Sequence, residues 1–331
     1  MIVDLWENPI VRVALAPAAG VYGAVVAARN ALYDRGVLSV HRPAIPTISV
    51  GNLTVGGTGK TPIVSHLSQI LRERGRQPAV VLRSYRSGDE LLVHRALQPQ
   101  YFAIASLDRL GSIAKAAAMG CDVAVLDDGF QHRRVARAAD IVLVSADSWP
   151  GPHALLPAGP WREPLSSLRR SSLVIVTRKA VDETAAEAVA TIVQEAVPVG
   201  VPTAVASLLF DALRAKGGET RPLATLAGQR VHAVTAIGNP RAFFAQLRAT
   251  GAEIVPHAFR DHHAYTPADV ARLVRAANGA AVVCTLKDAV KLMPLWPEEP
   301  QTLWYVSQRV NFDRGLDALH GVLDSAIREP A

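Results

Sequence analysis

The segment GNLTVGGTGKTP, residues 51–62, has the composition of a loop that binds the phosphates of a nucleotide. Glycines let main-chain N–H groups approach phosphate oxygens, and a lysine and a hydroxyl at the end of the loop supply a cation and a Mg²⁺ ligand. The usual pattern G-x-x-x-x-G-K-[ST] is met except at its first position, where Thr54 replaces glycine. A chance glycine-rich turn between a strand and a helix is the alternative. We expect a variant phosphate loop that binds ATP through Thr54, Gly56, Gly57, Thr58, Gly59, Lys60 and Thr61.

A pair of carboxylates follows at the end of an apolar run. The segment DVAVLDDGFQH, residues 122–132, predicts a buried strand that delivers Asp127 and Asp128 at its carboxyl end, where ligands bind in parallel sheets. Adjacent carboxylates repel each other unless a cation lies beside them, so these two are candidate Mg²⁺ ligands. The alternative is that they cap the next helix, with Asp128-Gly129 as a turn.

Three further polar clusters fit more than one interpretation. Asp89 follows the second predicted strand, where a capping box that begins at Ser87 explains it without any catalytic role. His262 belongs to FRDHHAY, and an exposed histidine pair is more often solvated than catalytic. The proline-rich LLPAGPWREP, residues 155–164, carries Arg162 and predicts a rigid loop that either contacts a phosphate or crosses the surface.

Elements that position these residues follow from the pattern of apolar runs. Apolar, β-branched runs alternate with stretches of helical spacing, which predicts an α/β fold with a P-loop NTPase-like parallel sheet covered on both faces. A second such series begins after residue 225 and predicts a smaller α/β domain. The expected divisions are an N-terminal apolar region at 1–35, the P-loop domain at 36–209, a polar, glycine-rich linker at 210–228 and the smaller domain at 229–331.

Composition limits the class of protein. The chain has 331 residues, 50% of them hydrophobic, and a net charge of +6. Aromatic residues make up only 5%, and no nucleic-acid-binding motif is found, so a nucleic-acid partner is not expected. Cys121 and Cys284 lie far apart beside apolar runs and are expected to be reduced, which favours the cytosol over an oxidising compartment.

The N-terminal segment VALAPAAGVYGAVVAA, residues 13–28, carries no charge. At 16 residues, with Pro17 inside, it is short for a membrane span. A helix buried against the domain and a helix in the membrane interface, with Trp6 and Tyr22 near the headgroups, are the two main interpretations.

Taken together, seven segments resemble the tetraacyldisaccharide 4'-kinase family over most of the chain, namely GNLTVGGTGKTP, GDE, DDGFQH, LLPAGPWREP, AIGNPRAFF, FRDHH and TLKDAVKL. That family's loop carries Ser or Thr at the position of Thr54. The resemblance implies ATP- and Mg²⁺-dependent phosphorylation of the 4'-hydroxyl of a tetraacyl glucosamine disaccharide 1-phosphate, a lipid A precursor. It also implies a peripheral enzyme whose N-terminal helix dips into the cytosolic face of the inner membrane. No obligate protein partner is expected.

The resemblance also implies roles for individual residues. It makes Asp89 the base, His262 its partner and Asp261 the neighbour of that histidine, with Lys60 acting on the phosphates. The Mg²⁺ ligands implied by family position are Thr61, Asp127, Asp128 and Glu163, and the substrate contacts are Arg109, Gln131 and Arg162.

Two rival functions remain to be separated from the kinase. A P-loop ATPase or GTPase switch acting on a protein partner predicts switch loops and, for GTP, an N-K-x-D-like motif that the sequence lacks. A metallophosphoesterase, suggested by DHH at 261–263, needs further Asp and His ligands for two metals, and it leaves the phosphate loop without a purpose.

Overall fold

The chain divides into two compact units, each of which is described by itself. The structure is a computed structural model that describes residues 6–84, 88–297 and 302–328. Unit 1 comprises Met1–Ser84, Gln98–Ser207 and Phe312–Ala331, and unit 2 comprises Tyr85–Leu97 and Leu208–Asn311. Two stretches therefore do not follow the expected division of the chain at 210–228. Residues 85–97 belong to unit 2 because their helix packs on another helix of that unit, and residues 312–331 belong to unit 1 because their helix packs on its sheet.

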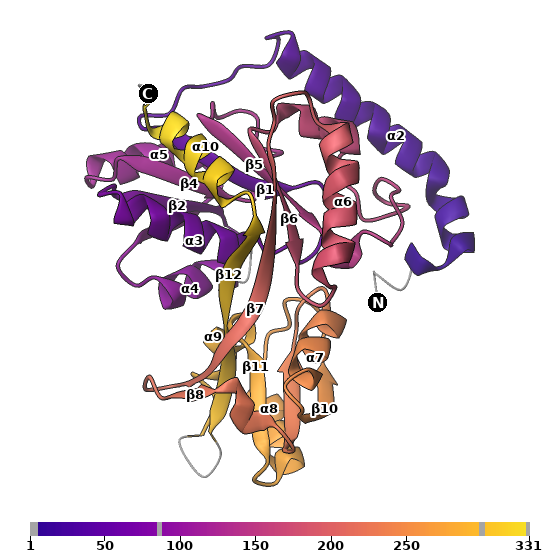
Figure 1. The fold of residues 1–331 in the computed structure, drawn as a ribbon, viewed down its shortest axis with the longest axis vertical. Helices are drawn as coiled ribbons and strands as arrows, with labels where there is room; N and C mark the ends of the chain where they lie inside the picture. The colour runs from indigo at the N-terminus through magenta and orange to yellow at the C-terminus, as the bar shows by residue number, and fades with distance from the viewer. Residues whose placement is uncertain (1–5, 85–87, 298–301, 329–331) are drawn as a thin grey trace. The chain divides into compact units, whose positions relative to one another are not determined.

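Unit 1 is built on a parallel sheet with the strand order β3-β2-β4-β1-β5-β6-β7. Its central strands are apolar and buried along most of their length, which confirms the predicted parallel sheet (Figure 1). The side chains of the edge strand β3 are only half-buried, in contrast to those of the central strands. The strands are β1 (Thr47–Asn52), β2 (Pro78–Arg83), β3 (Phe102–Ser106), β4 (Val123–Asp127), β5 (Ala139–Ser145), β6 (Leu173–Arg178) and the first part of β7 (Thr203–Ala215).

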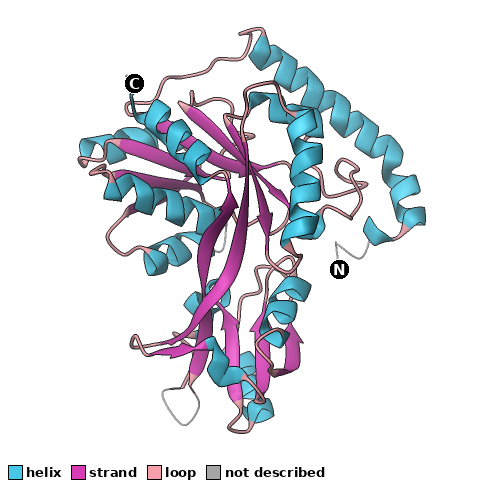
Figure 2. Ribbon diagram, viewed as in Figure 1, coloured by secondary structure: helices cyan, strands magenta, loops and turns pink. Residues whose placement is uncertain are grey.

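Helices cover this sheet and complete its core (Figure 2). Helices α3 and α5 pack on β1, β2, β3 and β4, whereas α6 packs on β6, and α10 packs on β5 and β6. Phe130, Leu168 and the side chains of α6 fill the core beneath β5 and β6. The helices of unit 1 are α2 (Pro9–Asp34), α3 (Lys60–Glu73), α5 (Arg109–Ala118), α6 (Glu183–Ala196) and α10 (Leu316–Arg328), with short 3₁₀ turns at Ala146–Ser148 and Leu165–Arg170.

Unit 2 contains the other strands of the same sheet and has its own core. Its strand order is β10-β9-β11-β12-β7, with β8 antiparallel to β7 and with β10, β9, β11 and β12 parallel. The side chains of α7 pack in one core cluster and those of α8 and α9 in another. The elements are α4 (Asp89–Leu97), β8 (Thr220–Pro222), a 3₁₀ turn (Leu223–Leu226), β9 (Arg230–Thr235), α7 (Pro240–Arg248), β10 (Glu253–Ala258), α8 (Pro267–Ala277), β11 (Ala281–Thr285), α9 (Leu286–Leu292) and β12 (Leu303–Arg314).

Helix α2 differs from the other helices because its apolar side chains face outward. Asn8 caps its first turn, accepting a hydrogen bond from the N–H of Ile10 at 2.9 Å. Ile10 is 77% exposed, and Val13 and Val21 are exposed to a similar degree. Among the described residues, α2 alone is long and apolar enough to cross a membrane, and its most apolar stretch has no buried residue. The interpretation of this segment as a helix buried against the domain is therefore wrong.

Candidate functional site

The phosphate loop joins the carboxyl end of β1 to the first residue of α3. Gly56 and Gly59 adopt φ angles of 114° and 90°, a region that favours glycine. Gly59 lies directly before α3, so the loop ends at a helix N-terminus, where main-chain N–H groups favour an anion. Below the loop, the amide of the buried Asn52 donates to Thr58 Oγ1 at 2.9 Å and accepts from Lys60 Nζ at 3.3 Å.

Thr54 lies beside the proline-rich loop. Thr54 and Trp161 form an isolated antiparallel bridge, and the N–H of Val55 donates to the carbonyl of Pro160 at 2.8 Å. The N–H of Arg162 donates to the carbonyl of Leu53 at 2.7 Å. The segment around Thr54 is thus held extended against residues 160–162, a conformation that any residue adopts, so glycine is not required at this position.

The Asp127-Asp128 pair follows the neighbouring strand. Because β4 lies next to β1, with Asp127 in register with Val50, the two carboxylates come to the edge of the sheet where the phosphate loop begins. Asp128 adopts a φ of 55°, an uncommon angle for a residue other than glycine. The buried guanidinium of Arg109 fixes this turn by donating to the carbonyls of Asp128 and Asp127 at 3.0 and 3.1 Å.

Cations surround the side chain of Asp128. Arg162 Nη1 lies 3.0 and 2.9 Å from its two carboxylate oxygens, and Lys60 Nζ lies 3.5 Å from one of them. Burial by itself raises the pKa of Asp128, but the nearby positive charges outweigh it and hold the pKa of this carboxyl below its ordinary value. Asp128 is therefore ionised at neutral pH.

The oxygen donors in this cluster suit a magnesium ion. Thr61 Oγ1 lies 3.5 Å from Asp127 Oδ2, and Asp128 follows in the chain. Mg²⁺ prefers oxygen ligands and binds through one or two carboxylates together with substrate phosphates, so it needs no larger set of protein ligands. No group of three or more His, Cys, Asp or Glu side chains that could bind a metal is found among the described residues.

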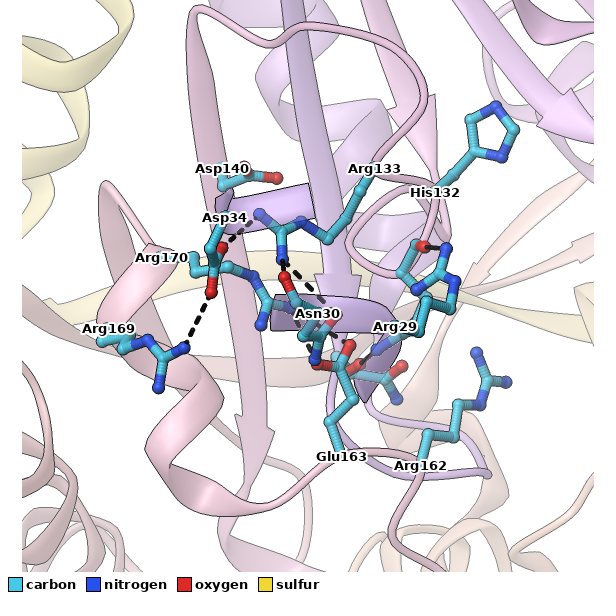
Figure 3. A network of polar contacts seen from close by, with 12 residues as sticks. Arg29, Asn30, Asp34, His132, Arg133, Asp140, Arg162, Glu163, Arg169 and Arg170 are labelled. Carbon is cyan, nitrogen blue, oxygen red and sulfur yellow. Dashed lines mark hydrogen bonds and ion pairs between the residues drawn. The ribbon is translucent and has the colours of Figure 1, made fainter. Parts of the chain in front are cut away.

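Gln131 and Glu163 make different contacts from those expected for substrate and metal ligands. Gln131 Nε2 donates to the carbonyl of Asn52 at 2.9 Å, while its buried Oε1 has no hydrogen-bond partner. The carboxylate of Glu163 accepts from Asn30 Nδ2 at 2.8 Å and from Arg170 Nη2 at 2.9 and 3.1 Å (Figure 3). Glu163 is thus bonded to helix α2, and its contact with a metal stays a prediction.

A second cluster lies in unit 2 and contains Asp89. The structure brings Asp89 and His262 together, with His262 Nδ1 at 3.5 Å from Asp89 Oδ2. The ammonium group of Lys291 lies 3.2 Å from the same oxygen and donates to the carbonyl of His263 at 2.9 Å. Asp89 is 3% exposed, and its Oδ2 accepts no hydrogen bond. The first residue of α4 is Asp89 itself, whereas Ser87, the expected start of a capping box, lies outside the described residues.

Neighbouring residues fix the loop that carries His262. Its φ is 58°, and its N–H donates to Asp261 Oδ1 at 3.1 Å and to the carbonyl of Ala236 at 3.2 Å. The N–H of Ala236 in turn donates to the buried carboxylate of Asp288 at 2.9 Å. Asp261 therefore supports the main chain of His262, and Lys287 Nζ contacts His262 Nε2 at 3.2 Å.

Sequence reasoning missed three polar residues of these clusters. Asn52 was quoted within the phosphate-loop motif without a role, although it links Thr58 and Lys60. Lys179 follows β6, and its ammonium donates to the carbonyl of Gly57. Lys291 lies one helical turn after Lys287 on α9, and that spacing is the signal that could have placed both on one face.

Comparisons with known proteins agree with this geometry. A family model described as Tetraacyldisaccharide-1-P 4'-kinase matches residues 11–90 and 86–328. A tetraacyldisaccharide 4'-kinase from Halorhodospira halophila is 40% identical over 323 residues, which cover 91% of this chain and 89% of that protein. One from Xanthomonas euvesicatoria is 38% identical over 299 residues, covering 85% and 84%.

A solved structure matches as well. The crystal structure of LpxK from Aquifex aeolicus in complex with ATP superposes with a TM-score of 0.76 at 27% identity, covering 96% of this chain and 99% of that one. These matches confirm the kinase interpretation over that of a switch protein. The chain therefore belongs to the tetraacyldisaccharide-1-phosphate 4'-kinase family.

Proposed function

We propose that the chain transfers the γ-phosphoryl group of ATP to the 4'-hydroxyl of a tetraacyl glucosamine disaccharide 1-phosphate during lipid A biosynthesis. Membership of the family implies a lipid A disaccharide substrate. The observation that carries the proposal is the buried Asp89, which is paired with His262 and Lys291. The chain has this candidate base as well as a phosphate loop. A hydrolytic switch needs no base for an alcohol acceptor, whereas a kinase uses one.

On the nucleotide side, the loop main chain and Lys60 would bind the phosphates, and the Lys60 charge would stabilise the departing ADP. Thr61, Asp127 and Asp128 would hold Mg²⁺, which supplies charge neutralisation on the transferred phosphoryl group when bound. Arg162 keeps Asp128 ionised and in place, and the buried Arg109 fixes the turn that presents it.

On the acceptor side, Asp89 would take the proton of the attacking hydroxyl. His262 orients Asp89 through the contact at 3.5 Å, and Asp261 holds the main chain of His262. Proton transfer by a positioned base typically contributes about 10²–10⁴-fold to the rate. Gln131 Oε1, which has no partner, would accept from a hydroxyl of the acceptor sugar, and the partly exposed guanidinium of Arg162 would contact the sugar or its 1-phosphate.

Family membership also implies a membrane-associated enzyme. We propose that α2 lies in the cytosolic leaflet of the inner membrane with its exposed valines and isoleucine among the acyl chains, as a peripheral contact. The lipid acceptor then needs to leave the bilayer only in part.

The proposal is tested by incubating the purified chain with γ-labelled ATP and fractionated bacterial lipid extracts, and then locating the label. Label on the 4'-position of a tetraacyl disaccharide is expected. Asp89→Asn is expected to lose about 10²-fold or more in kcat while still binding a fluorescent ATP analogue, whereas Lys60→Ala loses both properties. ADP release without any labelled lipid would contradict the proposal.

A further inference from the structure

Helix α2 has a second, polar side that is bonded to the loops of the nucleotide cluster, all within unit 1. Tyr22 Oη donates to the carbonyl of Arg162 at 3.0 Å, and Arg29 Nη2 donates to the carbonyl of Gln131 at 2.8 Å. Asn30 Nδ2 donates to the carboxylate of Glu163 at 2.8 Å (Figure 3). The three hydrogen bonds join residues more than 100 positions apart in the sequence. On the helix, Tyr22 lies about two turns before the adjacent residues Arg29 and Asn30.

Two of the residues that α2 contacts through their main chain also contact the nucleotide cluster through their side chains. The side chain of Arg162, whose carbonyl accepts from Tyr22, binds both carboxylate oxygens of Asp128. The side chain of Gln131, whose carbonyl accepts from Arg29, donates to the carbonyl of Asn52. Helix α2 thus bonds to the main chain of two residues, Arg162 and Gln131, whose side chains contact Asp128 and Asn52 of the nucleotide cluster.

Burial makes the contact at Glu163 costly to break. Asn30 is 6% exposed and Glu163 2%, so the carboxylate relies on Asn30 and Arg170 to replace its lost hydration. Arg170 also lies over the ring of Phe130, 4.5 Å from its centroid, which ties this network to the turn after Asp128. Burial raises the pKa of Tyr22, so its hydroxyl stays protonated and can donate to the carbonyl of Arg162.

We propose that α2, besides contacting lipid, sets the position of Arg162 and through it that of Asp128, with Tyr22 and Asn30 as positioning residues for phosphoryl transfer. The polar side of the helix fixes residues 162 and 163, and its opposite apolar side is free for the membrane. Docking at the lipid surface and alignment of the nucleotide cluster are then linked through one rigid element. This inference rests on the proposed function.

The experiment compares Tyr22→Phe with Tyr33→Phe on the same helix. Tyr33 contacts Arg29 and Arg133 through its ring, which phenylalanine keeps. Tyr22→Phe removes the one donor to the carbonyl of Arg162 that comes from α2. A lost hydrogen bond predicts about a 5–10-fold lower kcat with lipid acceptor in mixed micelles, and the Mg²⁺ concentration for half-maximal rate should rise. The Tyr33→Phe variant is expected to match the wild type.

Further readouts separate positioning from loss of structure or of lipid contact. Sedimentation with anionic vesicles is expected to be equal in the two variants, and all rates are measured below both thermal midpoints. A merely structural role would lower the midpoint without changing the Mg²⁺ dependence, so a changed Mg²⁺ dependence identifies positioning. If Tyr22→Phe does not fold, Arg29→Met serves in its place, because it removes the donor to the carbonyl of Gln131 without leaving a buried carboxylate unpaired, and it should shift the Mg²⁺ dependence in the same direction. Equal kcat and Mg²⁺ dependence in Tyr22→Phe and wild type would overturn the inference.

If the proposed function itself is wrong, the assay gives a different result. In that case the wild-type chain itself yields no labelled lipid. The inference is then judged by the Mg²⁺-dependent binding of a fluorescent ATP analogue, which should weaken about 5–10-fold in Tyr22→Phe only. Unchanged binding would again overturn it.

Discussion

The substitution Lys291→Met tests how far this ammonium group holds the buried carboxylate of Asp89. The ammonium of Lys291 lies 3.2 Å and the imidazole of His262 3.5 Å from the same oxygen. At an effective dielectric constant of 20, unit charges at the distance of the Lys291 contact attract by about 5 kcal/mol. Lys291 is 12% exposed and His262 is 40% exposed, so solvent weakens the contact of His262 more than that of Lys291.

Solvent screening predicts that substitution of Lys291 lowers the stability, whereas substitution of His262 lowers kcat. Breaking a buried pair leaves an uncompensated charge and lowers the stability by about 3–5 kcal/mol. Because Lys291 is partly reached by solvent, we expect Lys291→Met to lie at the lower end of this range, about 3 kcal/mol. An exposed pair contributes about 0–1 kcal/mol, so His262→Ala should change the stability little and lower kcat instead. Adding Asp89→Asn to Lys291→Met removes the stranded charge and should restore most of the lost stability.

Hydrogen–deuterium exchange measures the local loss of stability. The amides of α4 and α9, which pack on each other within unit 2, should exchange about 100-fold faster in Lys291→Met, corresponding to about 3 kcal/mol. Lys287→Met is the matched control, because Lys287 lies one turn earlier, is 24% exposed and pairs with the exposed Asp261. If Lys291→Met exchanges as slowly as Lys287→Met, or if the double variant is as unstable as the sum of the single changes, the reasoning fails.

Two other substitutions test the nucleotide unit. An alanine Cβ at Gly51 would lie 2.5 Å from Phe130 Cβ and 2.7 Å from its main-chain nitrogen, so Gly51→Ala should lower stability by about 1–3 kcal/mol or more in a thermal melt. Gly20→Ala, where nothing lies within 4 Å, should instead be neutral or slightly stabilising. Burial and the charges of four nearby arginines lower the pKa of His132 to about 4, so the folded state favours the neutral ring and loses stability as the pH falls from about 6.5 through 4. His132→Gln should shrink the drop in thermal midpoint between pH 7 and pH 5, and an equal drop would contradict this assignment.

The sequence predicts well those features that local patterns determine. The strand–loop–helix context of the phosphate loop and the buried strand before Asp127 lie within short segments, and the family and fold class that they indicate are confirmed. The sequence does not show contacts between distant positions. Lys291 reaches Asp89 across about 200 residues, and this contact came from packing of α4 on α9, which no motif records.

Side-chain direction is the other feature that a motif leaves open. Family position predicts that Arg162 contacts the substrate and that Glu163, the next residue, is a Mg²⁺ ligand. In the structure Arg162 binds Asp128, while Glu163 turns to Asn30 of α2. The exposed apolar face of α2 likewise depends on what the folded chain leaves uncovered, and a period of apolar residues is the same for a buried and for a lipid-facing helix.

The geometry around Asp128 supports the proposed link between α2 and catalysis. Lys60 Nζ lies 3.3 Å from Asn52 Oδ1 and 3.5 Å from Asp128, longer than the roughly 2.7–2.9 Å of a strong charged hydrogen bond. Arg162 binds the same carboxylate at 2.9 and 3.0 Å. Lys60 can therefore exchange Asp128 for a phosphate oxygen at little cost, because Arg162 still pairs with the carboxylate. Since Tyr22 bonds to the main chain of Arg162, the partner that remains in place during this exchange is the one that α2 positions.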